Sequence, residues 1–133
     1  MVRLLLDTNI ISDLVRHPRG RIAARIAKVR ERHICTCIIV AAEGRYGAAK
    51  KGSSQLTAQL EAVLGALDVL VLEAHVDTVC GELRVRLEHV GQSIGANDLL
   101  IAAHAMALGH TVVTENEREF SRIDNLQVEN WLR

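Results

Sequence analysis

Several acidic and amide side chains directly follow or open apolar stretches of this sequence, a pattern typical of ligand sites in α/β proteins. They are Asp7, Glu43, Asp98, Asn116 and Glu119. Carboxylates that lie close together raise one another's pKa, and a hard divalent cation removes that conflict. Because the donors are oxygens with no histidine at a matching position, the pattern indicates Mg²⁺, with Mn²⁺ as the alternative, rather than zinc. One or two such ions could activate a water for attack on a phosphodiester.

Asp7 shows both the case for a metal site and the simpler alternative. It ends the apolar run Val2–Leu6, which is typical of a buried strand, and is followed by Thr8 and Asn9. A carboxylate at the end of a buried strand is costly to desolvate unless it is paired or binds a cation. The simpler interpretation is that Asp7 caps the next helix and that the other acids complement helix dipoles. The metal interpretation therefore requires acids from separate segments to reach the same edge.

Alternating segments predict a parallel sheet covered by helices. The predicted strands are residues 2–6, 34–40, 69–72, 111–114 and 126–128, with amphipathic segments between them. Right-handed crossovers would bring all the carboxyl ends of the strands to one edge. We expect Glu43 in the first turn of a helix over 41–51 and Asp98 in the first turn of a helix capped by Asn97. Both side chains would then point back toward that edge.

Composition limits the class of protein. The 133 residues are enough for one domain, and we expect residues 1–133 to form it. Basic and acidic residues balance at 16 each, so nucleic-acid binding would rest on a local patch. The strongly basic region, residues 16–32, is either a solvated surface or one that contacts phosphates. The apolar stretch Leu99–Gly109 is too short to cross a bilayer, and three cysteines cannot all pair within one chain, so we expect a cytoplasmic protein.

Histidine and cysteine offer one further metal interpretation. His33, Cys35 and Cys37 alternate along the second predicted strand and would share one of its faces. No second ligand pair follows at the interval of a zinc finger, and buried thiols are common in strands, so we favour a packing role. His104 lies within the apolar helix, where we expect a core or interface histidine rather than a metal ligand.

Four segments of the chain resemble a known family. They are Leu5-Leu6-Asp7-Thr8-Asn9, residues 42–47 (AEGRYG), residues 94–104 (IGANDLLIAAH) and residues 113–120 (VTENEREF). In this order the chain is similar to PIN-domain ribonucleases, specifically to VapC-type toxins of bacterial toxin–antitoxin pairs. The similarity runs from end to end and includes residues 128–131 (VENW). It implies a PIN-like three-layer α/β/α sandwich with a mainly parallel central sheet.

The resemblance also implies an activity and a site. Family members are Mg²⁺-dependent endoribonucleases that hydrolyse RNA phosphodiester bonds. The metal centre would be formed by Asp7, Glu43 and Asp98, with Glu119 as a fourth catalytic acid in the closer toxin subgroup. The accessory positions would be Thr8, Asn9, Thr114 and Asn116. The implied partners are the RNA substrate, a cognate antitoxin that silences the enzyme, and a second copy of the chain in a homodimer or a larger toxin–antitoxin assembly.

A departure from the family pattern at Gly44 and two alternative functions stay open at this stage. Gly44 stands where an apolar residue, often leucine, is usual, so we expect looser packing behind Glu43. The main alternative is a catalytically inactive PIN-like module that binds RNA or protein. An acid-pocket phosphatase is less favoured, because Asp7-Thr8-Asn9 lacks the second acid of an Asp-x-Asp signature. A small antitoxin-like reading frame just upstream would favour the toxin.

Overall fold

The computed structural model describes residues 2–133, in which five parallel strands form one sheet. The strands are β1 (Leu4–Leu6), β2 (Ile34–Cys37), β3 (Asp68–Leu70), β4 (Thr111–Val113) and β5 (Val128–Glu129). Their order across the sheet is β3-β2-β1-β4-β5. Leu5 pairs with Cys35 on one side and with Val112 on the other, which puts β1 at the centre. This sheet confirms the α/β class predicted from the sequence.

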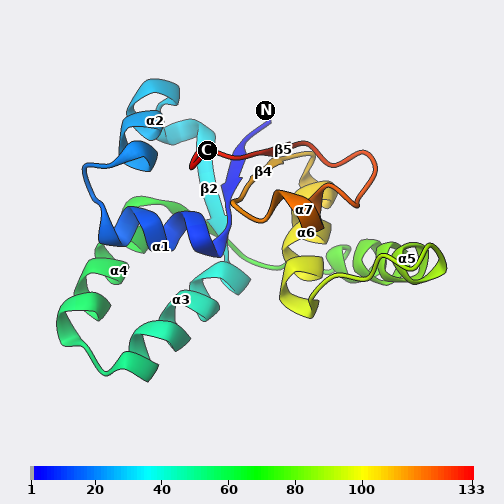
Figure 1. Ribbon diagram of the computed structural model, residues 1–133, viewed down its shortest axis with the longest axis horizontal. Helices are drawn as coiled ribbons and strands as arrows, with labels where there is room; N and C mark the ends of the chain where they lie inside the picture. The colour runs from blue at the N-terminus through cyan, green and yellow to red at the C-terminus, as the bar shows by residue number, and fades with distance from the viewer. Residues whose placement is uncertain (1) are drawn as a thin grey trace.

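Helices cover both faces of the sheet (Figure 1). They are α1 (Thr8–Arg16), α2 (Arg21–Val29), α3 (Ile38–Lys51), α4 (Ser54–Ala66), α5 (Val76–His89), α6 (Ala96–Leu108) and α7 (Glu117–Phe120), with a short 3₁₀ turn at Glu31–His33. Figure 1 shows α1, α2 and α4 on one side of the strands and α5, α6 and α7 on the other. The three layers are those of the predicted α/β/α sandwich.

The core is aliphatic and centres on β1 and α6. Leu5 and Leu6 are fully buried, and so are Ile101, Ala102 and Ala105 on α6. This agrees with the prediction that the apolar helix is covered on most sides. No helix in the described part of the chain has both the length and the apolar character needed to span a bilayer.

Some predicted boundaries were wrong. The strand expected over residues 34–40 ends at Cys37, and α3 begins at Ile38. A short β-branched run fits either element by pattern alone, and here Val40 is buried from a helix. Glu43 therefore lies in the second turn of α3 rather than the first. Helix α6 starts at Ala96 with Gly95 as its N-cap, so Asn97 is not the cap that we expected.

The two cysteines of β2 are packing residues. Cys35 and Cys37 are fully buried in the sheet. Burial raises the pKa of the Cys35 thiol to about 11 and also raises the pKa of the Cys37 thiol. Both thiols are therefore protonated at neutral pH, a state that is a poor metal ligand.

Candidate active site

The site lies between β1 and β4. Strands β2 and β3 are added on one side of β1, and β4 and β5 on the other, so the strand order reverses at this point. Asp7 directly follows β1 and Thr114 directly follows β4. The Asp7 backbone N–H donates to the carbonyl of Val113 at 2.9 Å, and the Thr114 hydroxyl donates to Asp7 Oδ2 at 2.7 Å. In open parallel sheets the carboxyl ends of strands at such a reversal form the ligand crevice.

The carboxylate of Asp7 does not cap the helix that follows it. Asp7 is the N-cap residue of α1, but its side chain makes no capping hydrogen bond within the described residues. It is 2% exposed, and its second oxygen, Oδ1, is buried without a hydrogen-bond partner among residues 2–133. Burial raises the pKa of Asp7 more than the Thr114 hydrogen bond lowers it, and the charges of Glu43 and Glu119 raise it further. The simpler interpretation of this acid is therefore wrong.

Glu43 is held by two polar side chains from other helices. The Thr8 hydroxyl at the start of α1 donates to its Oε1. The Asn97 amide in the first turn of α6 donates to its Oε2 at 3.3 Å. These bonds tie α3 to the ends of α1 and α6 and turn Glu43 toward the edge that holds Asp7. The one-turn error in its predicted position thus leaves the convergence intact.

Asp98 and Glu119 form a pair that Asn116 bridges. The Asn116 side-chain amide donates to Asp98 Oδ2 at 3.2 Å and to Glu119 Oε2 at 2.6 Å, and the Gly95 backbone N–H donates to Glu119 Oε1 at 3.3 Å. Burial, followed by a hydrogen bond with Glu119 and the charge of Asp7, raises the pKa of Asp98 to about 7. The bonds from Asp98 and Asn116 lower the pKa of Glu119. Below about pH 7 the pair therefore shares one proton, which Asp98 holds.

The remaining accessory residues connect the two loops beneath the carboxylates. The Thr114 hydroxyl, besides its bond to Asp7, accepts a hydrogen bond from the Asn116 backbone N–H at 2.9 Å. The Asn9 side chain accepts one from the Glu115 backbone N–H at 3.0 Å. Residues after β1 and after β4 are thus fixed relative to each other before any ligand binds.

The arrangement fits a hard cation that also keeps water ligands. Within residues 2–133, no group of three or more His, Cys, Asp or Glu side chains is placed so that it could hold a metal ion by itself. Mg²⁺ is commonly held by one or two carboxylates and several waters, so a complete protein cage is not required. The donors are all oxygens, and Asp7 Oδ1 is a buried acceptor in need of a partner. The mutual raising of carboxyl pKa values marks the same site as short of positive charge.

Known proteins resemble this chain over nearly its whole length. The PIN domain family matches residues 4–126. Ribonuclease VapC2 of Rickettsia felis is 40% identical over 129 residues, 96% of each chain, and the tRNA(fMet)-specific endonuclease VapC of Shigella flexneri is 31% identical over 132 residues, 98% of this chain and 99% of the other. A crystal structure of VapBC2 from Rickettsia felis, bound to a DNA fragment from its promoter, superposes with a TM-score of 0.89 at 36% identity, covering 98% of this chain and 99% of the other.

The chain belongs to the PIN-domain family, in its VapC group. In this PIN domain Asp7, Glu43, Asp98 and Glu119 lie at one edge of the sheet, as the strand and helix pattern predicted, and their catalytic and metal-binding roles stay predictions. Sequence reasoning missed Asn97, which it assigned to capping. Its position beside Asp98 in the first turn of α6 was the available signal, because consecutive residues there both border the edge.

Gly44 does not loosen the PIN domain in the way expected from the sequence. Leu60 of α4 fills the space beside it, and a Cβ built at Gly44 would lie 3.2 Å from Leu60 Cδ1. The missing side chain on α3 is thus offset by a close approach of α4. The helix that carries Glu43 is supported from behind, since Leu60 itself is buried.

Proposed function

We propose that this PIN domain is an Mg²⁺-dependent endoribonuclease toxin, controlled by a cognate antitoxin. The observation that carries the proposal is the unpartnered, buried Oδ1 of Asp7 beside the other carboxylates of the edge. Support for RNA as substrate comes from relatives named ribonuclease and tRNA(fMet)-specific endonuclease, which match nearly the whole chain. The presence of the entire acid set argues against an inactive binding module.

In this proposal Asp7, Glu43 and Asp98 hold the cation, in part through its bound waters. Each oxygen of Glu43 that accepts a hydrogen bond keeps a second lone pair. The hydrogen bonds from Thr8 and Asn97 therefore orient the carboxylate and leave lone pairs for the cation. When bound, Mg²⁺ supplies charge neutralisation at the phosphate and lowers the pKa of bound water. Asp98 must give up its proton before it can serve as a ligand, which makes binding pH-dependent.

Glu119 is the proposed proton acceptor. Its pKa is held below the ordinary range, so it is ionised at neutral pH, and it lies beside Asp98 at the rim of the site. A water oxygen attacks the phosphorus and one water proton passes to the Glu119 carboxylate. The bond from phosphorus to the leaving ribose oxygen breaks, and that oxygen keeps the electron pair and takes a proton from a second water. Asn116 positions Glu119 for this step through its amide.

Partners and compartment follow from related proteins and from thiol chemistry. The Rickettsia felis and Salmonella typhimurium structures are VapBC complexes bound to DNA, and we propose that this chain likewise assembles with an antitoxin. The homodimer expected from the resemblance stays a prediction, which light scattering of the purified protein would test. Free Cys35, Cys37 and Cys80 suit the reducing cytoplasm, where we propose that the protein acts.

The direct test is cleavage of RNA by the purified protein. Initiator tRNA and total RNA are incubated with Mg²⁺ or with EDTA, and the new RNA ends are mapped. We expect cleavage with Mg²⁺ alone and none by Asp98→Asn, while Asp77→Asn, a substitution of an exposed acid on α5, cleaves as the wild type does. Circular dichroism checks the fold of each variant. RNA binding without any cleavage would favour the inactive module.

A further inference from the structure

A cavity of about 170 Å³ adjoins the carboxylate edge. Thr8 and Glu43 form its inner wall, and Ser12, Arg16 and Lys51 border it further out. The volume is several times the roughly 30 Å³ that one water occupies in the liquid, so it has room for a tetrahedral anion. Any ligand in this cavity would lie next to the residues that we propose hold the cation.

The two cations at this cavity are available for a ligand. Neither Arg16 nor Lys51 forms an ion pair with an acid anywhere in residues 2–133, in contrast to Arg45 and Arg84. The Nε of Arg16 donates to the Ser12 carbonyl at 3.3 Å, which directs the guanidinium along α1 and leaves its terminal nitrogens without a hydrogen-bond partner among residues 2–133. A planar guanidinium and a nearby ammonium are a common pair for phosphate recognition.

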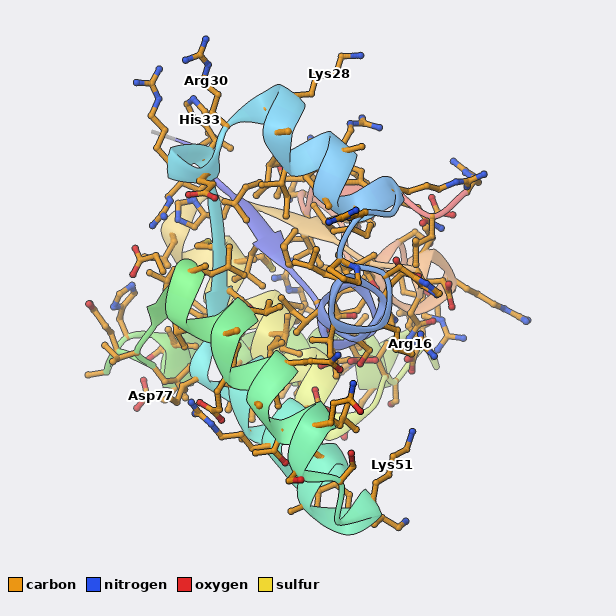
Figure 2. The ribbon with its side chains drawn as sticks, turned by 90° about the vertical axis from the view of Figure 1, so that its left-hand side faces the viewer. Arg16, Lys28, Arg30, His33, Lys51 and Asp77 are labelled. Atoms are coloured by element: carbon orange, nitrogen blue, oxygen red, sulfur yellow. The ribbon has the colours of Figure 1, made fainter. Side chains whose placement is uncertain are left out.

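Most of the basic region does not share this position. Figure 2 shows Arg16 and Lys51 on the same side of the molecule, while Lys28 and Arg30 extend from the end of α2 that lies far from Lys51. Of the seven basic side chains in residues 16–32, Arg16 alone lines the cavity beside Glu43. The basic region is therefore not one continuous patch, and Arg16 is its one member that borders the site.

The floor of the cavity is kept open by a glycine that the fold does not require. Gly47 lies inside α3, where glycine is less stable than alanine. Its φ is not positive, and a Cβ built there would meet nothing within 4 Å. Packing and backbone geometry thus give no reason for its presence, whereas an open cavity does, because a side chain at 47 would enter the space between Glu43 and Lys51.

We propose that this cavity binds a backbone phosphate of the RNA next to the scissile phosphate, with Arg16 and Lys51 as its ligands and Gly47 leaving room for it. The proposal rests on the ribonuclease function above and adds the direction in which the strand leaves the carboxylates, toward the ends of α1 and α3. Arg16 and Lys51 are positioning residues, since they hold the strand and do not touch the reacting atoms. They also lie in the last turns of their helices, where a cation interacts favourably with the negative end of the helix dipole.

Arg86→Gln controls for that dipole effect, because Arg86 is an exposed cation in the last turn of α5, on the opposite side of the sheet. Binding of a fluorescein-labelled single-stranded RNA oligomer is measured by anisotropy in an Asp98→Asn background without divalent cations. We expect Arg16→Gln and Lys51→Gln each to weaken binding about 3- to 10-fold at ~0.1 M salt and to reduce the log–log salt slope by ~0.7. Arg86→Gln leaves both quantities unchanged.

Gly47→Leu tests the cavity itself. Leucine favours the helix, so the thermal stability of the variant should equal or exceed that of the wild type, while RNA affinity falls by a similar factor. Gly81→Leu, the same change at an open helical position in α5, should leave affinity unchanged. In the active protein Arg16→Gln should raise KM and leave kcat within about twofold.

Equal affinities and salt slopes for the Arg16, Lys51 and Arg86 variants would overturn the proposal. A wild-type protein that binds no RNA would also overturn it. So would variants that keep the wild-type RNA affinity and lose only antitoxin binding. Binding is measured without catalysis. A protein that binds RNA as expected but does not cleave it would therefore contradict the proposed function and still support the phosphate site.

Discussion

The Thr114 hydroxyl donates to Asp7 Oδ2 across 2.7 Å and joins the ends of the two strands that frame the site. Thr114 is fully buried and Asp7 nearly so, so this bond is made out of reach of bulk water. It satisfies one oxygen of the carboxylate, and the other, Oδ1, has no hydrogen-bond partner among residues 2–133. Thr114 therefore fixes the orientation of Asp7 and limits the rise of its pKa.

Thr114→Val should show this role. Valine keeps the shape of threonine but leaves Asp7 Oδ2 without its donor, which costs about 1–3 kcal/mol of stability. The pKa of Asp7 rises further, so the acid limb of the kcat/KM profile should move to higher pH and activity at neutral pH should fall. Thr111→Val, a change at the buried threonine that begins β4, is the matched control. A pH–rate profile that does not move would contradict the assignment.

Stability should depend on pH and Mg²⁺ together. The folded-state pKa of Asp98 lies near 7, above its value of 3.8 when unfolded, so the folded chain binds more protons between these values. This acid therefore costs stability as pH rises from about 4 to 7. Binding of Mg²⁺ offsets part of this cost, because at ten times Kd it adds about 1.4 kcal/mol to the stability. Thermal melts should show an Mg²⁺-induced rise of roughly 3–6 °C near pH 8 and a smaller one near pH 5.5.

Asp98→Asn supplies the control for that linkage. The amide neither titrates nor replaces the carboxylate as a ligand, so the Mg²⁺-induced rise and its pH dependence should both be largely lost. An Mg²⁺ effect that is larger at low pH, or that is the same in Asp98→Asn, would argue that the ion binds elsewhere.

His104 should contribute the opposite pH dependence. It is 1% exposed, its Nδ1 has no partner within residues 2–133, and it borders a cavity of about 200 Å³ with Glu73, His75 and His110. Burial lowers its pKa, so the unfolded chain binds more protons below about pH 6.5 and stability falls on acidification. His104→Leu should reduce the loss in urea-unfolding free energy between about pH 7 and 5. The same substitution at exposed His89 should not, and equal slopes for the two variants would refute the idea.

The packing of α4 behind the site makes a further prediction. Gly44→Leu forces side-chain atoms into Leu60 and should destabilise the fold by about 1–3 kcal/mol. Leu60→Ala alone should cost about 2–5 kcal/mol through the cavity that it leaves. The double variant should be more stable than the sum of the two losses, because leucine at 44 refills that space. Strictly additive losses in urea melts would show that the two positions are independent.

The sequence predicted the carboxylate edge of the sheet better than it predicted the helices and side chains around that edge. Asp7, Glu43, Asp98 and Glu119 could be placed at one edge because they follow or open apolar segments, and parallel connectivity fixes where strands end. The start of α3 could not be placed, since Ile38-Ile39-Val40 suits a strand as well as a helix. Nor could the partners of Asn97 and Asn116 be found, because amide hydrogen bonds depend on side-chain geometry between segments. The cavity beside Glu43 depends on how α1, α3 and α4 pack, which no local pattern encodes.

The most direct test of the carboxylate site is anomalous scattering from crystals soaked in Mn²⁺, which prefers the same oxygen donors as Mg²⁺. We expect an anomalous peak within coordination distance of Asp7 Oδ1 and of the Asp98 carboxylate, and no peak there in Asp98→Asn. A peak elsewhere on the surface, or an empty edge at saturating Mn²⁺, would contradict the account.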